Sequence, residues 1–273
     1  MSEYIDLTVI IPVHKMDEVD VPFFNNAIES IKKSTVKPKK IIITTCNCPG
    51  TVEFLEKFDN NWDSNIYGET EVEIVKHDNT NDFCSQINHG SKFVKTKYFS
   101  ILEFDDEYTP IWFKNFSEYE KHYPEVKVFL PMVVDVNTSK EFLGFTNEAA
   151  WAMGFSDKLG FLDENALLKF PNFQTSGAII DKEMYEEMGG LKPSMKLTFV
   201  YEFLLRLARF DVKIMTIPRV GYLHTNMREN SLFWDYKHNP ELKINGEEAN
   251  HWLETAKKEY YYKHERDGVE YEG

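Results

Sequence analysis

Short apolar runs alternate with amphipathic segments along the first hundred residues. Apolar and β-branched residues gather in four runs that are typical of buried strands, at 7–12, 40–45, 72–75 and 98–102. Between these runs, apolar side chains recur at helical spacing over 22–31, 52–58 and 82–94. This βα alternation predicts right-handed crossovers and an α/β fold with a mostly parallel central sheet flanked by helices.

The second half of the chain is less regular. Strands are predicted at 126–134 and 212–217, and helices at 181–189, 199–210 and 246–264. Residues 137–172 show no clear periodicity, and long segments of this kind in compact domains are often lids or binding loops. We expect one large α/β domain over residues 1–232, followed by a C-terminal helical extension over residues 233–273.

Acidic residues follow the fourth predicted strand directly. The run 98–102 ends in Glu103, Asp105, Asp106 and Glu107. Carboxylates at the C-terminal end of a buried strand place hard oxygen ligands in the crevice of an open α/β sheet, and the i, i+2 spacing puts Glu103 and Asp105 on one face. The pattern predicts a divalent-cation site. The alternatives are a charged loop after an edge strand and, for Asp106 and Glu107, acidic residues that favour the start of the next helix.

Composition narrows the classes of partner. The 273 residues carry a formal net charge of −14, which argues against broad electrostatic attachment to nucleic acid or anionic lipid. No stretch approaches the roughly 18–20 unbroken apolar residues of a membrane span, and no secretory signal is visible. The three cysteines, Cys46, Cys48 and Cys84, make up neither a disulfide framework nor a four-ligand zinc set. We therefore expect a cytoplasmic protein.

Four segments resemble, in order and spacing, the motifs of family 2 glycosyltransferases. Val9–His14, Gln86–Gly90, Leu102–Pro110 and Thr175–Gly190 are similar to the first strand, the Asn-x-Gly segment, the Asp-x-Asp-Asp-x-x-x-Pro motif and the acceptor-side Ser-Gly strand of that family. Glu103 stands in place of the usual first Asp of the third motif. The resemblance covers residues 7–232 and implies a GT-A fold. It also implies inverting transfer of a sugar from a nucleotide-diphosphate sugar, with a UDP-sugar as the expected donor.

The resemblance also implies a metal cofactor. Transfer needs the leaving diphosphate to be neutralised, usually by Mn²⁺ or Mg²⁺ acting as a Lewis acid. Asp105 matches the direct metal ligand of the family, and His224 matches a late histidine that touches the metal or the diphosphate. Glu103 is expected to reach the ribose or a metal-bound water. Asp106 is expected to take a catalytic part by orienting the acceptor or the surroundings of the metal.

Further residues are expected to bind the donor nucleotide. Pro12 and His14 end the first predicted strand, where the family contacts the base, and Asn88 belongs to the Asn-x-Gly segment. Asn47 takes the place of the acidic residue usually found after the second strand, and we expect it to hydrogen-bond a uracil edge. We expect Arg228 to clamp phosphate oxygens with its planar guanidinium.

The general base departs from the family pattern. The Glu-Asp pair that usually begins a late helix is absent from Leu197–Ala208. Glu202 is the nearest carboxylate in this otherwise apolar stretch. We predict that it takes the proton of the acceptor hydroxyl, with a pKa raised by its apolar surroundings. The alternative is an ion pair with Arg206 at i, i+4 on one helix.

The sequence leaves the acceptor open between a saccharide and a hydroxylated nucleobase in DNA, and the negative charge counts against the second. Two other functions also remain. A nucleotidyltransferase would use a similar sheet and acidic site, but Val13–Asp17 lacks the glycine-rich basic loop that holds a triphosphate. The missing Glu-Asp pair would fit a catalytically silent module that binds a nucleotide sugar or a partner.

Overall fold

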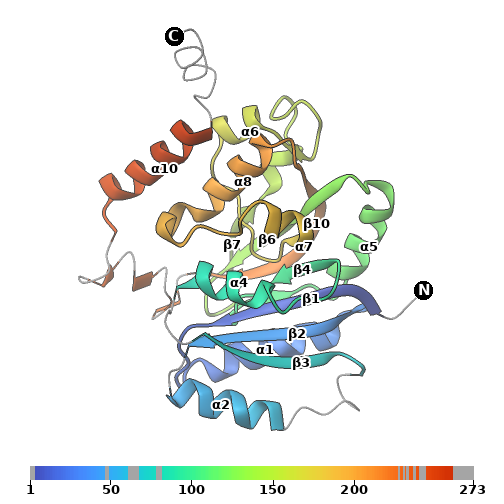
Figure 1. Cartoon of the computed structure of the whole chain (residues 1–273), viewed down its shortest axis with the longest axis vertical. Coiled ribbons are helices and arrows are strands. Elements are labelled where there is room, and N and C mark those ends of the chain that lie inside the picture. The colour runs from blue at the N-terminus through green and yellow to red at the C-terminus, as the bar shows by residue number, and fades with distance from the viewer. Residues whose placement is uncertain are drawn as a thin grey trace.

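A mixed sheet runs through the middle of the molecule (Figure 1). The fold is that of a computed structural model, which describes residues 4–46, 49–60, 68–77, 82–226, 228–229, 231, 234–235, 238–239 and 244–260. Within these residues, ten strands form one sheet in the order β3-β2-β1-β4-β9-β6-β10-β5, with β7 paired to β6 and β8 to β10. The strands are β1 (Tyr4–Val13), β2 (Lys37–Cys46), β3 (Glu71–His77), β4 (Tyr98–Ile101), β5 (Glu107–Tyr108), β6 (Val126–Val136), β7 (Phe142–Thr146), β8 (Phe161–Leu162), β9 (Ile179–Asp181) and β10 (Lys213–Thr225).

The direction of the strands agrees with the sequence-based expectation. The four strands β3, β2, β1 and β4 are neighbours in this order and all run parallel. β6 is likewise parallel to β10. Short β9 lies antiparallel between β4 and β6 and joins the two parallel blocks. The predicted α/β fold with a mostly parallel central sheet is therefore confirmed. The chain order reverses at β1, because β2 lies on one side of it and β4 on the other. In open α/β sheets, ligands bind at such a reversal, beyond the carboxyl ends of the strands.

Helices cover both faces of the sheet. The helical elements are α1 (Val21–Lys33), α2 (Pro49–Asn60), α4 (Phe83–Ser91), α5 (Trp112–His122), η1 (Glu148–Trp151), α6 (Glu164–Lys169), α7 (Lys182–Glu187), η2 (Pro193–Thr198), α8 (Phe199–Arg209) and α10 (Gly246–Tyr260). The apolar faces of α1, α2 and α5 pack in one core with Val9 and Ile11 of β1, while Ile10 belongs to a second core with α4, α7 and α8. This division follows from the alternation of side chains along a strand.

The expectation of an irregular segment at residues 137–172 is wrong in part. This segment contains β7, η1, β8 and α6. β7 pairs antiparallel with β6, and β8 pairs antiparallel with β10. These elements are short and depend on tertiary partners, so the local hydrophobic pattern does not reveal them. β10 also runs beyond the predicted end at Ile217, because the register shifts between Thr216 and Val220 and thereby accommodates Pro218.

The predicted C-terminal helix is present as α10. Ala256 of α10 is fully buried, and Lys196 Nζ of η2 lies 2.7 Å from Glu248 Oε1. Figure 1 shows α10 beside α8, with which it is in contact. The division into a domain at 1–232 and an extension at 233–273 remains a prediction. In the part of the chain that the structure describes, no helix has the length and apolar character needed to cross a membrane.

Candidate functional site

Two adjoining cavities open beyond the carboxyl ends of β1 and β4, at the reversal of strand order. The small cavity has a volume of about 40 Å³ and the large cavity about 500 Å³. Their shared lining residues are Phe83, Glu103, Asp105 and Ser231. Because the carboxylates that follow β4 stand at this common border, one elongated ligand could contact both cavities and the acidic residues together.

Glu103, Asp106 and His224 form what we call the acidic cluster. One potential ligand atom from each lies within 4.8 Å of the others. Asp106 is almost fully buried, and its Oδ1 accepts a hydrogen bond of 2.6 Å from the backbone N–H of Thr225. Its Oδ2 is buried and has no hydrogen-bond partner among the described residues. A buried carboxylate oxygen without a partner is costly, and a cation is the ligand that would satisfy it.

The position of His224 is set by a carboxylate on the neighbouring strand. His224 Nδ1 lies 2.8 Å from Asp135 Oδ1, and Asp135 Oδ2 accepts a hydrogen bond of 2.6 Å from the Thr146 hydroxyl. This contact leaves Nε2 as the ring nitrogen available to the acidic cluster. A carboxylate behind a metal-binding histidine is the usual way of fixing the orientation of the ring.

The buried carboxylates of the acidic cluster favour a positive charge close to them. Burial raises the pKa of the Glu103 and Asp106 carboxyls, and the charge of Asp105 adds to both shifts, while the charge of His224 opposes them. The charge of Glu103 raises the pKa of Asp106 further. Burial alone lowers the pKa of His224, but the charge of Asp106, the hydrogen bond to Asp135 and the charge of Glu103 together raise it to about 10. Two carboxylates and one imidazole are a donor set that suits a divalent cation. The residues present therefore fit the metal expected from the sequence.

Asp105 lies outside the acidic cluster. Arg228 Nε donates to Asp105 Oδ2 at 2.6 Å, and Arg228 Nη1 donates to Asp20 Oδ1 at 2.8 Å. The guanidinium carbon of Arg228 also lies 4.9 Å from the centroid of the Phe104 ring. The structure thus brings Asp105 and Arg228 together at the small cavity. Their predicted roles, as metal ligand and phosphate clamp, remain predictions.

Pro12 and His14 both line the small cavity, beside Phe104. The rings of His14 and Phe104 lie 5.9 Å apart, and the His14 carbonyl accepts a hydrogen bond of 2.6 Å from the thiol of Cys46. Burial lowers the pKa of His14, and the charge of Arg228 lowers it further, so a neutral imidazole is favoured. Asn47 lies outside the described residues.

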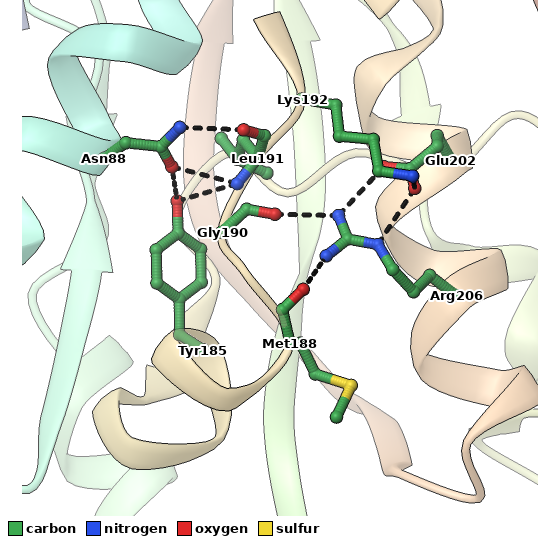
Figure 2. A network of polar contacts seen from close by, with 8 residues as sticks. All are labelled: Asn88, Tyr185, Met188, Gly190, Leu191, Lys192, Glu202 and Arg206. Atoms are coloured by element: carbon green, nitrogen blue, oxygen red, sulfur yellow. Dashed lines mark hydrogen bonds and ion pairs between the residues drawn. The ribbon is translucent and has the colours of Figure 1, made fainter.

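Asn88 lies in a polar network behind the site and lines neither cavity. Its Oδ1 accepts hydrogen bonds from the Tyr185 hydroxyl at 2.6 Å and the Leu191 N–H at 2.9 Å, and its Nδ2 donates to the Leu191 carbonyl at 2.7 Å (Figure 2). These bonds hold α7 and the loop after it against α4. The donor-binding role expected for Asn88 is not supported by these contacts.

Glu202 belongs to the same network. It is fully buried, and its two oxygens accept hydrogen bonds of 2.9 Å from Arg206 Nε and Nη2 (Figure 2). Arg206 also donates hydrogen bonds to the backbone carbonyls of Met188 and Gly190. Neither cavity is lined by Glu202, although the preceding Val200 and Tyr201 line the large one. The structure therefore favours the i, i+4 ion pair, the alternative that the sequence left open, over a general base.

The sequence matches the family model for glycosyl transferase family 2 over residues 8–188, about two thirds of the chain. The chain belongs to this family. The predicted family is thereby confirmed, and the nucleotidyltransferase alternative receives no support. A comparison with curated proteins finds no match.

Solved glycosyltransferase structures share the fold of this family 2 chain. Residues 1–349 of TarS from S. aureus in complex with UDP-GlcNAc give a TM-score of 0.65 at 13% identity, covering 92% of this chain and 65% of that one. The mannosyltransferase PcManGT from Pyrobaculum calidifontis, in complex with GDP-Man and Mn²⁺, gives a TM-score of 0.60 at 13% identity, covering 84% and 59%. The chain thus spans less than two thirds of the length of these structures. The GT-A fold is confirmed.

Three residues at the site of this glycosyltransferase family member were not singled out from the sequence. Asp135 orients His224, and the signal for it is an acidic residue inside the apolar run of β6. The hydroxyl of Ser176 donates to Glu103 Oε1 at 2.7 Å. Gln86 lines the small cavity. Ser176 and Gln86 lie within segments that resemble the family, but no local pattern separates them from their neighbours.

Gly177, next to Ser176, is a position where we predict a loss of stability. Its φ is +72°, and a Cβ added there would lie 2.4 Å from Tyr222 Cδ2. We expect Gly177→Ala to lower the free energy of unfolding by about 2–5 kcal/mol, because strain in the left-handed region adds about 1–2 kcal/mol to an overpacking cost of about 1–3 kcal/mol. Urea unfolding measures this change. Gly144→Ala is the control, since no atom lies within 4 Å of its added Cβ. Equal effects at both positions would contradict the prediction.

Proposed function

We propose that this chain transfers a sugar, with inversion, from a nucleotide-diphosphate sugar to an acceptor hydroxyl. The observation that carries the proposal is the acidic cluster, with the unpartnered Oδ2 of Asp106, at the border of two cavities. Family membership supports the reaction class. The solved structures with the same fold hold UDP-GlcNAc in one case and GDP-Man with Mn²⁺ in the other, which supports the class of donor.

Glu103, Asp106 and His224 would hold the metal, which we propose to be Mn²⁺ rather than Mg²⁺ because an imidazole joins the carboxylates. When bound, such an ion supplies Lewis-acid neutralisation of the leaving diphosphate. Asp135 keeps His224 turned toward the cluster, and Ser176 holds one oxygen of Glu103 in place. These contacts fix the donor set before a ligand arrives, so little reorganisation is needed.

The two cavities suggest how the donor would lie. The small cavity, with Pro12 and His14, would take the base of a UDP-sugar, and Asn47 remains a proposed partner of that base. The diphosphate would lie at the shared border, within reach of Arg228. The sugar and the acceptor would then occupy the large cavity, which Ser176 also lines. A saccharide acceptor is our proposal.

Proton removal needs a carboxylate that faces the acceptor. Within the described residues, Glu103 and Asp105 are the carboxylates that line the large cavity. Glu103 belongs to the acidic cluster, so Asp105 is the carboxylate left to accept the proton of the acceptor hydroxyl. This assignment competes with the sequence-based prediction that Asp105 is a metal ligand, and locating the metal distinguishes the two.

A catalytically silent nucleotide-sugar-binding module is the second candidate. One observation favours it: Glu202 faces Arg206 and not the large cavity. The two functions differ in turnover. An enzyme releases free nucleoside diphosphate from a nucleotide sugar continuously when an acceptor is supplied, whereas a binding module releases none beyond the uncatalysed rate.

Calorimetric titration with UDP, GDP, CDP and TDP, each with and without Mn²⁺, tests the proposed donor site. We expect UDP to bind most tightly, with an affinity at least about tenfold higher when Mn²⁺ is present, which is about 1.4 kcal/mol. Absence of binding for all four nucleotides, with the protein folded, would contradict the proposed function.

Arg228→Lys is expected to weaken the binding of UDP with Mn²⁺ by about tenfold, because lysine keeps the charge but loses the planar pair of donors. Arg228 now bridges Asp20 and Asp105 and borders the small cavity. The matched control is Arg219→Lys, because the exposed Arg219 donates to the carbonyl of its neighbour Pro218 and lines neither cavity. Calorimetry measures both. Equal affinities for wild type and Arg228→Lys would remove Arg228 from the donor site.

A further inference from the structure

Gln86 is a buried amide that has no hydrogen-bond partner among the described residues. Its side chain is fully buried in α4, one turn from the start of the helix. Neither Nε2 nor Oε1 has a hydrogen-bond partner in the described part of the chain. Burying a carboxamide without compensation opposes folding, and native proteins leave few such groups unsatisfied. Gln86 lines the small cavity. A ligand in that cavity is therefore the partner that we expect for its amide.

The other side-chain amide of α4 behaves differently. Asn88 lies two residues later, and its Oδ1 and Nδ2 bond to Tyr185 and Leu191. It lines neither cavity. The amide of Asn88 thus bonds within the fold, while the amide of Gln86 has no partner in the described part of the chain and lines the small cavity. The contrast separates a structural amide from a binding amide on the same element.

The surroundings of Gln86 suit a planar heterocycle. Flat side chains line the same small cavity, and these are Pro12, His14, Phe83 and Phe104. Aromatic faces and proline rings stack on planar rings, and a few placed polar groups then fix the orientation of the ligand. The charged residues Glu103 and Asp105 line the border with the large cavity, where a diphosphate would lie, and Arg228 lines the small cavity next to Asp105.

We propose that Gln86 is a specificity-determining residue that hydrogen-bonds the base of the donor nucleotide. The inference rests on the proposed function and adds the residue that reads the base. A carboxamide presents one donor and one acceptor side by side. This pair matches an adjacent N–H and C=O on a base edge, as in the imide of uracil, and it suits a UDP-sugar as donor. A site that hydrogen-bonds its ligand in this way discriminates strongly against ligands that leave the polar group unpaired.

The test compares wild type with Gln86→Leu, which removes both polar atoms at similar volume. The control is Thr216→Val, because Thr216 is also fully buried, its Oγ1 has no partner among the residues that the structure describes, and it lines neither cavity. Calorimetry in the presence of Mn²⁺ gives affinities for UDP, CDP, GDP and inorganic pyrophosphate, and urea unfolding without nucleotide gives the midpoint of each variant. Gln86→Met takes the place of Gln86→Leu if the leucine variant does not fold.

We expect Gln86→Leu to weaken UDP binding by about 10- to 100-fold and to bring the affinities for UDP, CDP and GDP close together. Pyrophosphate binding should stay unchanged, because the side chain is assigned to the base. The unfolding midpoint should stay or rise, since an unsatisfied amide is replaced by an apolar group. Thr216→Val should bind every probe as wild type does.

Other results would overturn the inference. An equal loss for all three nucleotides would place Gln86 on the ribose, and a loss of pyrophosphate binding would place it on the diphosphate. A lower unfolding midpoint with unchanged UDP affinity would make Gln86 a structural residue. In these three cases wild type still binds UDP, so the proposed function stands. Failure of wild type to bind any nucleotide would instead overturn the proposed function, and the inference with it.

Discussion

Asp106→Asn is expected to reduce sugar transfer by about 10²- to 10⁴-fold while the protein stays folded. Asparagine keeps an oxygen for the Thr225 N–H but removes the charge of the buried carboxylate in the acidic cluster. A metal in such a site contributes several kcal/mol of charge stabilisation in the transition state, which sets the size of the loss. Release of nucleoside diphosphate from a nucleotide sugar in the presence of Mn²⁺ measures the rate, and urea unfolding checks the fold.

Glu107→Gln is the matched control for Asp106→Asn. Glu107 is the next residue, but its carboxylate pairs with Lys140 at 2.7 Å and lies outside the acidic cluster. Loss of the Glu107 charge should lower the free energy of unfolding by at most about 1 kcal/mol, as for other exposed ion pairs. We expect the rate of sugar transfer to stay within about twofold of wild type. Transfer by Asp106→Asn at the wild-type rate would contradict a catalytic part for Asp106.

Glu202→Ala is expected to lower the free energy of unfolding by about 3–5 kcal/mol, because it leaves the buried guanidinium of Arg206 without its counter-charge. Urea unfolding gives this value. The double variant Glu202→Leu with Arg206→Met should lose much less than the sum of the single losses, since replacing both buried partners by apolar residues removes the unpaired charge.

Glu186→Ala is the control for this prediction. Glu186 makes the same i, i+4 contact with Lys182, at 2.9 Å, but on the surface of α7. We expect its free energy of unfolding to fall by about 0.5 kcal/mol or less.

The turnover of Glu202→Gln provides a second test of the role of Glu202. Unchanged turnover per folded molecule would agree with a positioning role in the network of Figure 2. A loss of about 10²-fold or more at unchanged stability would restore Glu202 as the general base.

The regular elements of the first half follow from local sequence. A strand such as β1 needs only a run of apolar, β-branched residues, and α1 needs only apolar side chains at helical spacing. β7 and β8 could not be found in this way. They owe their structure to pairing with β6 and β10, and two to five residues carry too short a pattern.

The residues of the acidic cluster could be predicted from the sequence, but their grouping could not. Glu103, Asp106 and His224 were all expected at the site, yet His224 lies 118 positions after Asp106 in the chain, so their grouping needed the fold. The pairing of Asp105 with Arg228 is likewise a long-range contact.

The surroundings of Asn88 and Glu202 could not be predicted from the sequence. Both are polar residues on helices, and such a residue gives the same sequence pattern whether it faces a cavity or a buried network. Only the contacts of Tyr185 and Arg206 distinguish the two cases.

The location of Mn²⁺ in crystals grown with UDP, found from its anomalous scattering, tests whether the acidic cluster holds the metal. We predict one strong peak bound by Glu103, Asp106 and His224, with the UDP diphosphate beside it and Asp105 outside the coordination sphere. A peak bound by Asp105 without Asp106 would contradict the assignment of the acidic cluster. Crystals that bind UDP without Mn²⁺ at the cluster would contradict the metal-dependent mechanism itself.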